Sequence, residues 1–223
     1  MNKVIAVVVA VLALGTFSTT SAVNMKWGGD LFFNGTFGGG LRGNTVEFMG
    51  YKISIKTPSS GFGFNWFYDL TYAEIDIGLI SGTLTQKGID IDGDPMDQSD
   101  GYAAFNIGAL GKYPVALSGY DNIGLWPALG IDYSFVGMEW QGKSCNSLWI
   151  KFGGGADYAW KEKMFLRAKL LYGIRMANEA ENYFKDQTGG KNVLGQGLDI
   201  GVGVGWYIRA REPSKSSGGN DFD

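Results

Sequence analysis

Residues 198–208 read LDIGVGVGWYI, and this stretch decides the fold. Every second residue from Leu198 to Ile208 is apolar, and between them stand Asp199, three glycines and Tyr207. Successive side chains of a β-strand point to opposite faces of its sheet. The stretch therefore predicts a strand with one wholly apolar face and one face of small or polar residues.

The same alternation recurs along the chain and predicts eight strands. Their expected bounds are 27–41, 60–68, 72–83, 101–113, 123–137, 148–160, 164–176 and 195–209. Short connections at 69–71 and 161–163 alternate with longer ones, as expected of a barrel with short turns at one end and long loops at the other. Residues 51–57 also alternate and could form a ninth strand, but single-chain bacterial barrels have even strand counts. We expect 45–57 to lie in an outer loop, or to extend the second strand through a bulge.

The glycine-rich face indicates which side of each strand points inward. The chain has 36 glycines among 223 residues, and small residues pack best where space is tight, inside a narrow barrel. The large apolar face then points outward, which is stable only in lipid. The sequence therefore predicts an all-β fold, an eight-stranded antiparallel up-and-down transmembrane β-barrel. A soluble, lipocalin-like barrel with the apolar face inside is the alternative.

The composition excludes several functional classes. The chain has no histidine, which excludes Ser-His-Asp and Cys-His nucleophile systems and histidine metal sites. A net charge of -3 with no basic stripe excludes a general nucleic-acid binder. Cys145 is the only cysteine, so the chain forms no internal disulfide. No cofactor is predicted.

The two ends of the chain differ from the alternating region. Lys3 precedes an apolar run that ends at Leu14, and small residues follow. This pattern predicts a secretory signal over 1–22, because the run is shorter than the about 20 residues that span a bilayer. The barrel is expected over 23–209. Residues 210–223 are polar and rich in serine and glycine, typical of a flexible periplasmic tail.

Aromatic residues cluster at the strand ends that the short turns join. Amphipathic aromatics collect where a membrane meets water, although tyrosine and tryptophan also favour strands in general. We interpret the cluster as an interfacial girdle. Its members are Trp66, Tyr68, Tyr72, Tyr113, Tyr158, Trp160 and Trp206.

The export signal, the eight alternating segments and the closing strand together resemble the small bacterial outer-membrane barrel superfamily that includes OmpX, OmpW and the OmpA membrane domain. The resemblance implies a place in the outer membrane of a diderm bacterium, with membrane lipid and the barrel-assembly machinery as partners. In that family the last strand is an assembly signal. The resemblance implies this role for Val202, Val204, Trp206 and Ile208. This chain departs from the family by continuing past the strand instead of ending on an aromatic residue.

Charged residues occupy predicted inward positions. An eight-stranded barrel is just wide enough for side chains to fill it, and buried charges need partners. We expect a lumen charge network of five acids and five bases that forms a rigid plug, with a gated polar path as the alternative. The residues are Glu74, Asp76, Lys112, Asp132, Lys151, Asp157, Arg167, Lys169, Arg175 and Asp199.

One loop has the opening spacing of a calcium site. Asp90, Asp92 and Asp94 match the first ligands of an EF-hand loop, but Pro95 replaces its glycine and Gly101 its final glutamate. We therefore expect a solvated acidic loop, with these three aspartates as no more than a weak metal candidate.

Three functions are compatible with such a barrel. Likeness to OmpW implies a passive, porin-like conduit for small hydrophobic molecules. Likeness to OmpX implies a surface-exposed barrel whose outer loops bind a host protein, as an adhesin does. Membrane enzymes of similar architecture depend on histidine, so we expect no enzyme.

Overall fold

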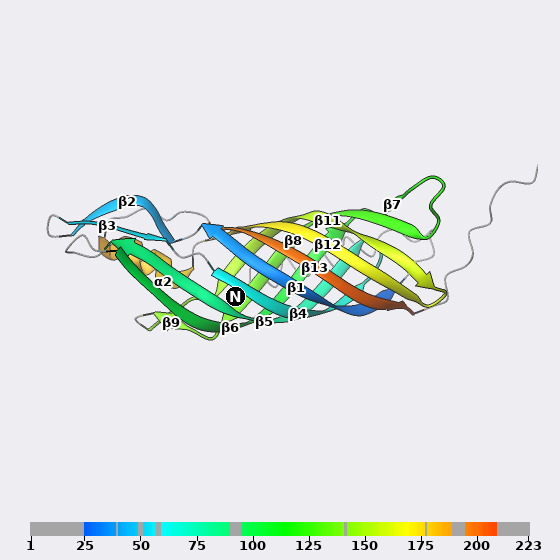
Figure 1. The fold of residues 1–223 in the computed structure, drawn as a ribbon, viewed down its shortest axis with the longest axis horizontal. Helices are drawn as coiled ribbons and strands as arrows, with labels where there is room; N and C mark the ends of the chain where they lie inside the picture. Colours follow the sequence, from blue (N-terminus) through cyan, green and yellow to red (C-terminus); the bar gives the residue numbers. More distant parts are fainter. Residues whose placement is uncertain are drawn as a thin grey trace, which may run out of the picture.

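Eight long strands close into a barrel in the computed structural model (Figure 1). The structure describes residues 25–38, 40–48, 51–56, 59–89, 95–140, 142–176, 178–188 and 195–208. The barrel strands are β1 (Lys26–Gly38), β4 (Ser59–Asp69), β5 (Ala73–Ile89), β6 (Pro95–Lys112), β8 (Ile123–Val136), β11 (Ser147–Lys161), β12 (Met164–Arg175) and β13 (Gly195–Tyr207).

Every strand of the ring pairs antiparallel with both neighbours. β1 lies between β4 and β13, and the β5–β6 and β6–β8 pairings complete the circle. The first and last barrel strands thus join directly, with Lys26 opposite Tyr207 at one end. The predicted eight-stranded antiparallel barrel is confirmed.

The two ends of the barrel are built differently. The additional elements are β2 (Gly40–Phe48), β3 (Tyr51–Lys56), β7 (Val115–Ala116), β9 (Glu139–Trp140), β10 (Lys143–Ser144) and α2 (Glu179–Thr188). Figure 1 shows β2, β3, β9 and α2 together at one end, which we call the loop end, and β7 at the opposite, turn end. No helix of the described residues is both long enough and apolar enough to cross a membrane.

Of the ambiguous segment 45–57, residues 45–48 and 51–56 are described, and both pieces are extended without joining the ring. β2 and β3 form an antiparallel hairpin, and β3 touches the barrel sheet through one pairing, Lys56 with Lys87 of β5. The expectation of an outer-loop segment is therefore consistent with its position, and its alternating pattern belongs to a hairpin at the loop end.

β5 and β6 extend well beyond their predicted ends. The sequence predicts a loop over 84–100, whereas pairing continues up to Ile89 with Pro95. Polar pairs occupy this extension, such as Thr85 opposite Ser99. Hydrophobic alternation disappears there, because no apolar environment selects for it, while the backbone hydrogen bonds continue.

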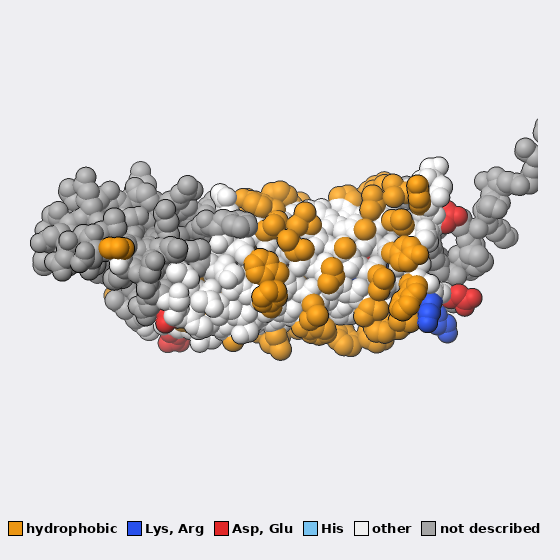
Figure 2. All heavy atoms as spheres, viewed as in Figure 1, with side chains coloured by type: hydrophobic (Ala, Val, Ile, Leu, Met, Phe, Trp, Pro, Cys, Tyr) orange, Lys and Arg blue, Asp and Glu red, His pale blue; other side chains and the backbone are white. Residues whose placement is uncertain are grey.

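The outer wall of the ring is free of charge. Taking every second residue from the first, the outward positions of 27–35, 60–68, 75–83, 103–111, 123–135, 148–160, 164–174 and 196–206 contain no Asp, Glu, Lys or Arg. Large apolar side chains there are strongly exposed, with Leu31 at 65%, Phe62 at 73% and Val202 at 61%. Figure 2 shows hydrophobic side chains spread over the visible wall, with charged ones toward its two ends. So large an apolar surface is stable only against lipid.

Glycines on the inner wall make room for large rings. A Cβ on Gly155 would stand 2.3 Å from the indole of Trp126, and one on Gly205 2.3 Å from the ring of Phe165. Both aromatic side chains are buried inside the barrel. The glycine-rich face is thus the inner face, as predicted, and it accommodates aromatic as well as polar groups.

Replacing Leu170 with arginine tests the assignment of faces. Leu170 is 53% exposed on the outer wall, near the middle of β12. An arginine at the bilayer midplane costs about 2–4 kcal/mol in such barrels. We expect Leu170→Arg to lower the stability of the barrel in urea unfolding from lipid vesicles, and Leu170→Met to change it little. Equal stability of the two variants would contradict the outward assignment.

A second prediction concerns the inner wall. Gly155→Ala places a methyl group against Trp126 and the Ala168 carbonyl oxygen, and overpacking of this kind costs about 1–3 kcal/mol. Gly124→Ala is the matched control, because a Cβ there meets nothing within 4 Å. Urea midpoints of both variants measure the difference, and an unaffected Gly155→Ala barrel would show that this wall is loosely packed.

Candidate functional site

Arg167 is the centre of the charged lumen. Its side chain is fully buried and faces three carboxylates from three other strands. The guanidinium donates to Asp69 Oδ2 at 2.8 Å, to Glu74 Oε2 at 2.6 Å and to Asp157 at 2.7 and 2.9 Å. Arginine suits this position because its planar fork holds several carboxylates at once and stays charged.

Aromatic rings enclose the same guanidinium. Its carbon lies 4.1 Å from the ring centre of Phe67, 5.0 Å from that of Trp126 and 5.3 Å from that of Phe165. Phe67 and Phe165 are completely buried. These contacts exclude water and add cation–π attraction, so the lumen is packed around the charge.

Two lysines complete this layer at the turn end. Lys112 pairs with Asp69 and, at 2.6 Å, with Glu74, and lies 4.5 Å from the ring centre of Trp126. Lys26 donates to Asp157 at 2.8 Å. Three bases thus face three acids, and this part of the lumen is neutral.

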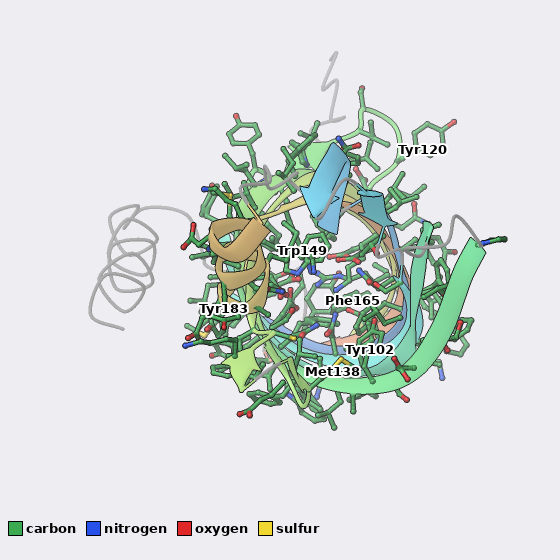
Figure 3. All side chains as sticks on the ribbon, turned by 90° about the vertical axis from the view of Figure 1, so that its left-hand side faces the viewer. Tyr102, Tyr120, Met138, Trp149, Phe165 and Tyr183 are labelled. Carbon is green, nitrogen blue, oxygen red and sulfur yellow. The ribbon has the colours of Figure 1, made fainter. Side chains whose placement is uncertain are left out.

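A second layer of ion pairs lies nearer the loop end. Lys169 pairs with Asp30 at 2.8 Å, and Lys151 with Asp199 at 2.7 Å and Asp132 at 3.1 Å. A cavity of about 10 Å³ adjoins both lysines and Asp76, which is space for about one water molecule. In Figure 3, viewed from the loop end, nitrogen- and oxygen-bearing side chains fill the centre of the ring.

Above this layer the lumen becomes apolar on one side. Phe32, Ile80 and Ala104 are buried together, and Tyr102 and Val136 pack against them. Figure 3 shows Tyr102 and Trp149 inside the ring. The lumen therefore changes from apolar near the loop end to densely charged near the turn end.

The structure places nine of the ten predicted lumen residues inside the barrel, each at most 9% exposed. Arg175 is the exception, because it lies at the loop end of β12 and pairs with Glu181 of α2. The predicted balance of five acids and five bases is wrong. Asp30 and Asp69 are also buried in the lumen, and Lys26 also pairs there.

The missed residues lie at strand ends or in the weakly alternating first strand. Asp69 is the last residue of β4, and its Oδ1 also accepts the Thr71 amide of the following turn at 2.8 Å. A turn aspartate is common, so its sequence position gave no sign of a lumen role. Asp30 does obey the parity of β1, between inward Gly28 and Phe32, and this parity could have identified it.

The predicted girdle residues lie at the turn end. A further aromatic residue, which the sequence analysis did not include, packs against two of them. Trp27 stacks between Trp66 and Trp206, with ring centres 5.3 and 4.9 Å apart. The stack crosses the seam between β1 and β13. The closing strand with Val202, Val204 and Trp206 is therefore fully engaged in the finished barrel, and its role in assembly stays a prediction.

Other predicted features lie outside the described residues. These are the signal segment 1–22, the tail 210–223 and the candidate metal ligands Asp90, Asp92 and Asp94. Within the described part, no group of three or more His, Cys, Asp or Glu could hold a metal ion. The side chain of Cys145 is half-buried.

Helix α2 is a feature of the loop end that the sequence prediction missed. Asn178 Oδ1 accepts the Glu181 amide at 2.8 Å, and Glu181 Oε2 accepts the Asn178 amide at 3.1 Å, which is a capping box. The spacing Asn-x-x-Glu was the available signal. Glu181 also pairs with Arg175, and Asn178 Nδ2 donates to the Cys145 carbonyl oxygen at 3.4 Å, so the helix is fixed to the barrel rim.

Comparisons with known proteins find similarity among solved structures alone. No protein-family model and no curated protein sequence matches the chain. The structure is similar to Neisserial surface protein A (NspA), with a TM-score of 0.48 and 10% identity over 82% of this chain and 97% of that one. It is also similar to the outer membrane protein OprG from Pseudomonas aeruginosa, with a TM-score of 0.45 and 14% identity over 85% and 97%. The outer membrane protease OmpT from Escherichia coli is a more distant match, with a TM-score of 0.35 and 9% identity over 85% and 99%.

Removing the central guanidinium should destabilise the barrel. Arg167→Leu leaves Asp69, Glu74 and Asp157 short of a partner, and breaking a buried ion pair from one side costs about 3–5 kcal/mol. We expect a clear drop in the urea midpoint of the folded barrel. Lys163→Leu, at an exposed turn position, is the control and should change little. Unchanged resistance to unfolding in Arg167→Leu would contradict a structural network.

Proposed function

We propose that this chain is a non-enzymatic integral barrel of the outer membrane that presents its loop end to a protein partner outside the cell. One observation carries the proposal: the lumen is sealed by charge, while folded, anchored structure is concentrated at the loop end. A barrel whose interior is filled has its free surfaces at its ends, and here the ends differ.

The sealed lumen argues against transport along the barrel axis. Arg167, its three carboxylates and the rings around it occupy the cross-section near the turn end, and Lys112 and Lys26 close the same layer. Passage of a solute would require these ion pairs to separate in a water-poor interior, which is costly. The same packing argues against catalysis, since the acids of this layer are held by cations.

The loop end has the features of a preformed binding surface. Helix α2 contacts β2 and β10, and its first turn is held by the capping box and by the Arg175–Glu181 ion pair. Ala180, in the first turn of α2, is buried at 5% exposure. Anchored loops lose less conformational freedom on binding than free ones, which favours recognition of a partner at this end.

A second candidate is the conduit for small hydrophobic molecules. The apolar patch of Phe32, Ile80 and Ala104 supports it, because the patch offers a small apolar solute a contact on the loop-end side of the charged layers. The charged layers below it oppose further passage. We therefore rank the conduit behind surface recognition.

Binding of whole cells tests the first candidate. Cells that display the chain should adhere to immobilised host matrix proteins, and replacing residues 40–56 with a short Gly-Ser link should abolish adhesion. Glu162→Gln, in an exposed turn at the opposite end, is the control and should adhere normally. Heat-modifiable migration of the barrel confirms assembly of each variant.

Planar bilayers test the second candidate with the same protein. A sealed lumen predicts no conductance steps from the purified barrel. Steps that are blocked by detergent-like molecules, together with cells that do not adhere, would overturn surface recognition in favour of a conduit.

A further inference from the structure

The buried lumen holds more acids than bases. Among the described residues, seven carboxylates are buried there, against four buried cations and Lys26 at the rim. The acids are Asp30, Asp69, Glu74, Asp76, Asp132, Asp157 and Asp199, and the buried bases are Lys112, Lys151, Arg167 and Lys169. The layer around Arg167 is balanced, so the excess belongs to the layer nearer the loop end.

Within that layer, the pairing leaves out one acid. Asp30 is paired with Lys169, whereas Asp132 and Asp199 share Lys151. The two acids that share a cation each accept a further hydrogen bond, Asp199 from Asn34 and Asp132 from Ser134 at 3.5 Å. These donors stabilise the charged form of a carboxylate.

Asp76 has no such support. It is 7% exposed, takes part in none of the ion pairs found within the described residues, and its Oδ1 is fully buried without a hydrogen-bond partner. It lines the small cavity on the opposite side of Gly108 from Asp132. Glu74 and Asp30 also have an oxygen without a hydrogen-bond partner. However, the other oxygen of Glu74 is held by Arg167 and Lys112, and Asp30 forms an ion pair with Lys169.

The charges that face Asp76 come from six strands. Glu74 lies on the same strand, and the rest project from β1, β8, β11, β12 and β13. The facing groups are Glu74, Asp30, Asp132, Lys151, Arg167, Lys169 and Asp199. All three cations among them are already engaged by other carboxylates, so an ionised Asp76 would add a charge to an acidic excess. A buried carboxylate in that position takes up a proton instead.

We propose that Asp76 is a proton-binding site in the sealed lumen: the folded barrel holds a proton there at neutral pH and is destabilised when that proton is lost. The proton converts the unpartnered carboxylate into a neutral group and removes one of the excess charges. Loss of the proton leaves an uncompensated charge beside the cavity, where entering water would solvate it and loosen the seal. The lumen seal is therefore sensitive to pH through the Asp76 carboxyl group.

The sign of the effect follows from proton binding. An unfolded chain releases the Asp76 proton above about pH 4, whereas the folded barrel keeps it. Folding then takes up a proton, and this residue's contribution to stability falls as the pH rises from about 4 through neutrality. Asp157, held by Arg167 and Lys26, is ionised in both states above about pH 4, so its contribution to stability is constant at neutral pH and is lost only as the pH falls below about 4.

Asparagine substitutions distinguish a protonated Asp76 from an ionised one. Asp76→Asn imitates the protonated acid, so its urea midpoint should match that of the wild-type barrel at pH 4 and exceed it increasingly up to pH 8. Asp157→Asn is the matched control, and its midpoint should lie below that of wild type by a constant amount from about pH 5 to pH 8. A midpoint of Asp76→Asn that falls below wild type at pH 8 would show that Asp76 is ionised and would overturn the proposal.

Two further measurements keep the proposal testable if a variant does not fold. Infrared spectra of the wild-type barrel at neutral pH should contain the carbonyl band of a protonated carboxylic acid, and its absence would overturn the proposal. Wild-type stability should also be the same in sodium, potassium and choline chloride at equal ionic strength. A dependence on which cation is present would assign the compensating charge to a bound metal ion instead of a proton.

Discussion

An uncharged outer wall imposes the main constraint on this barrel: the charges that its membrane-spanning strands carry must be accommodated inside a ring of eight strands. The space there is only enough for side chains, and water is scarce. Arg167 meets the constraint by engaging Asp69, Glu74 and Asp157 at once while Phe67, Trp126 and Phe165 pack against it. Glycines such as Gly155 and Gly205 make room for those rings. In this lumen the same residues therefore achieve both close packing and the pairing of charges.

The sequence predicts the ring well because one physical rule acts on each strand. Lipid outside and a crowded lumen inside select opposite residues on the two faces, so alternation marks β8, β11, β12 and β13 to within about two residues of their observed ends. The rule stops where the membrane stops. The upper parts of β5 and β6, the β2–β3 hairpin and helix α2 lie at the loop end, where no such selection acts. There only local signals remain, such as the Asn178 capping box.

The sequence predicts which charged residues of the strands point into the lumen, but not the numbers of acids and bases that meet there. Inward parity identifies Glu74, Lys151 and Arg167, whereas Asp69 belongs to a turn in the sequence and reaches the lumen only because β4 ends beside β5. Which acid pairs with which base depends on stagger between distant strands, as with Arg167 and Glu74, 93 residues apart. Alternation along one strand contains no information on that stagger, so the isolation of Asp76 could not be read from the sequence.

The orientation of the side chains in β12 is the most direct test of the whole account. Nitroxide labels placed singly at positions 166, 168, 170 and 172 of a Cys145→Ser barrel in lipid vesicles should collide with oxygen dissolved in the bilayer. Those at 171 and 173, on the inner face, should be shielded from both oxygen and a water-soluble relaxation agent. Labels at the even positions that collide mainly with the water-soluble agent would show that this face meets water, and the barrel would then not be a membrane-spanning one.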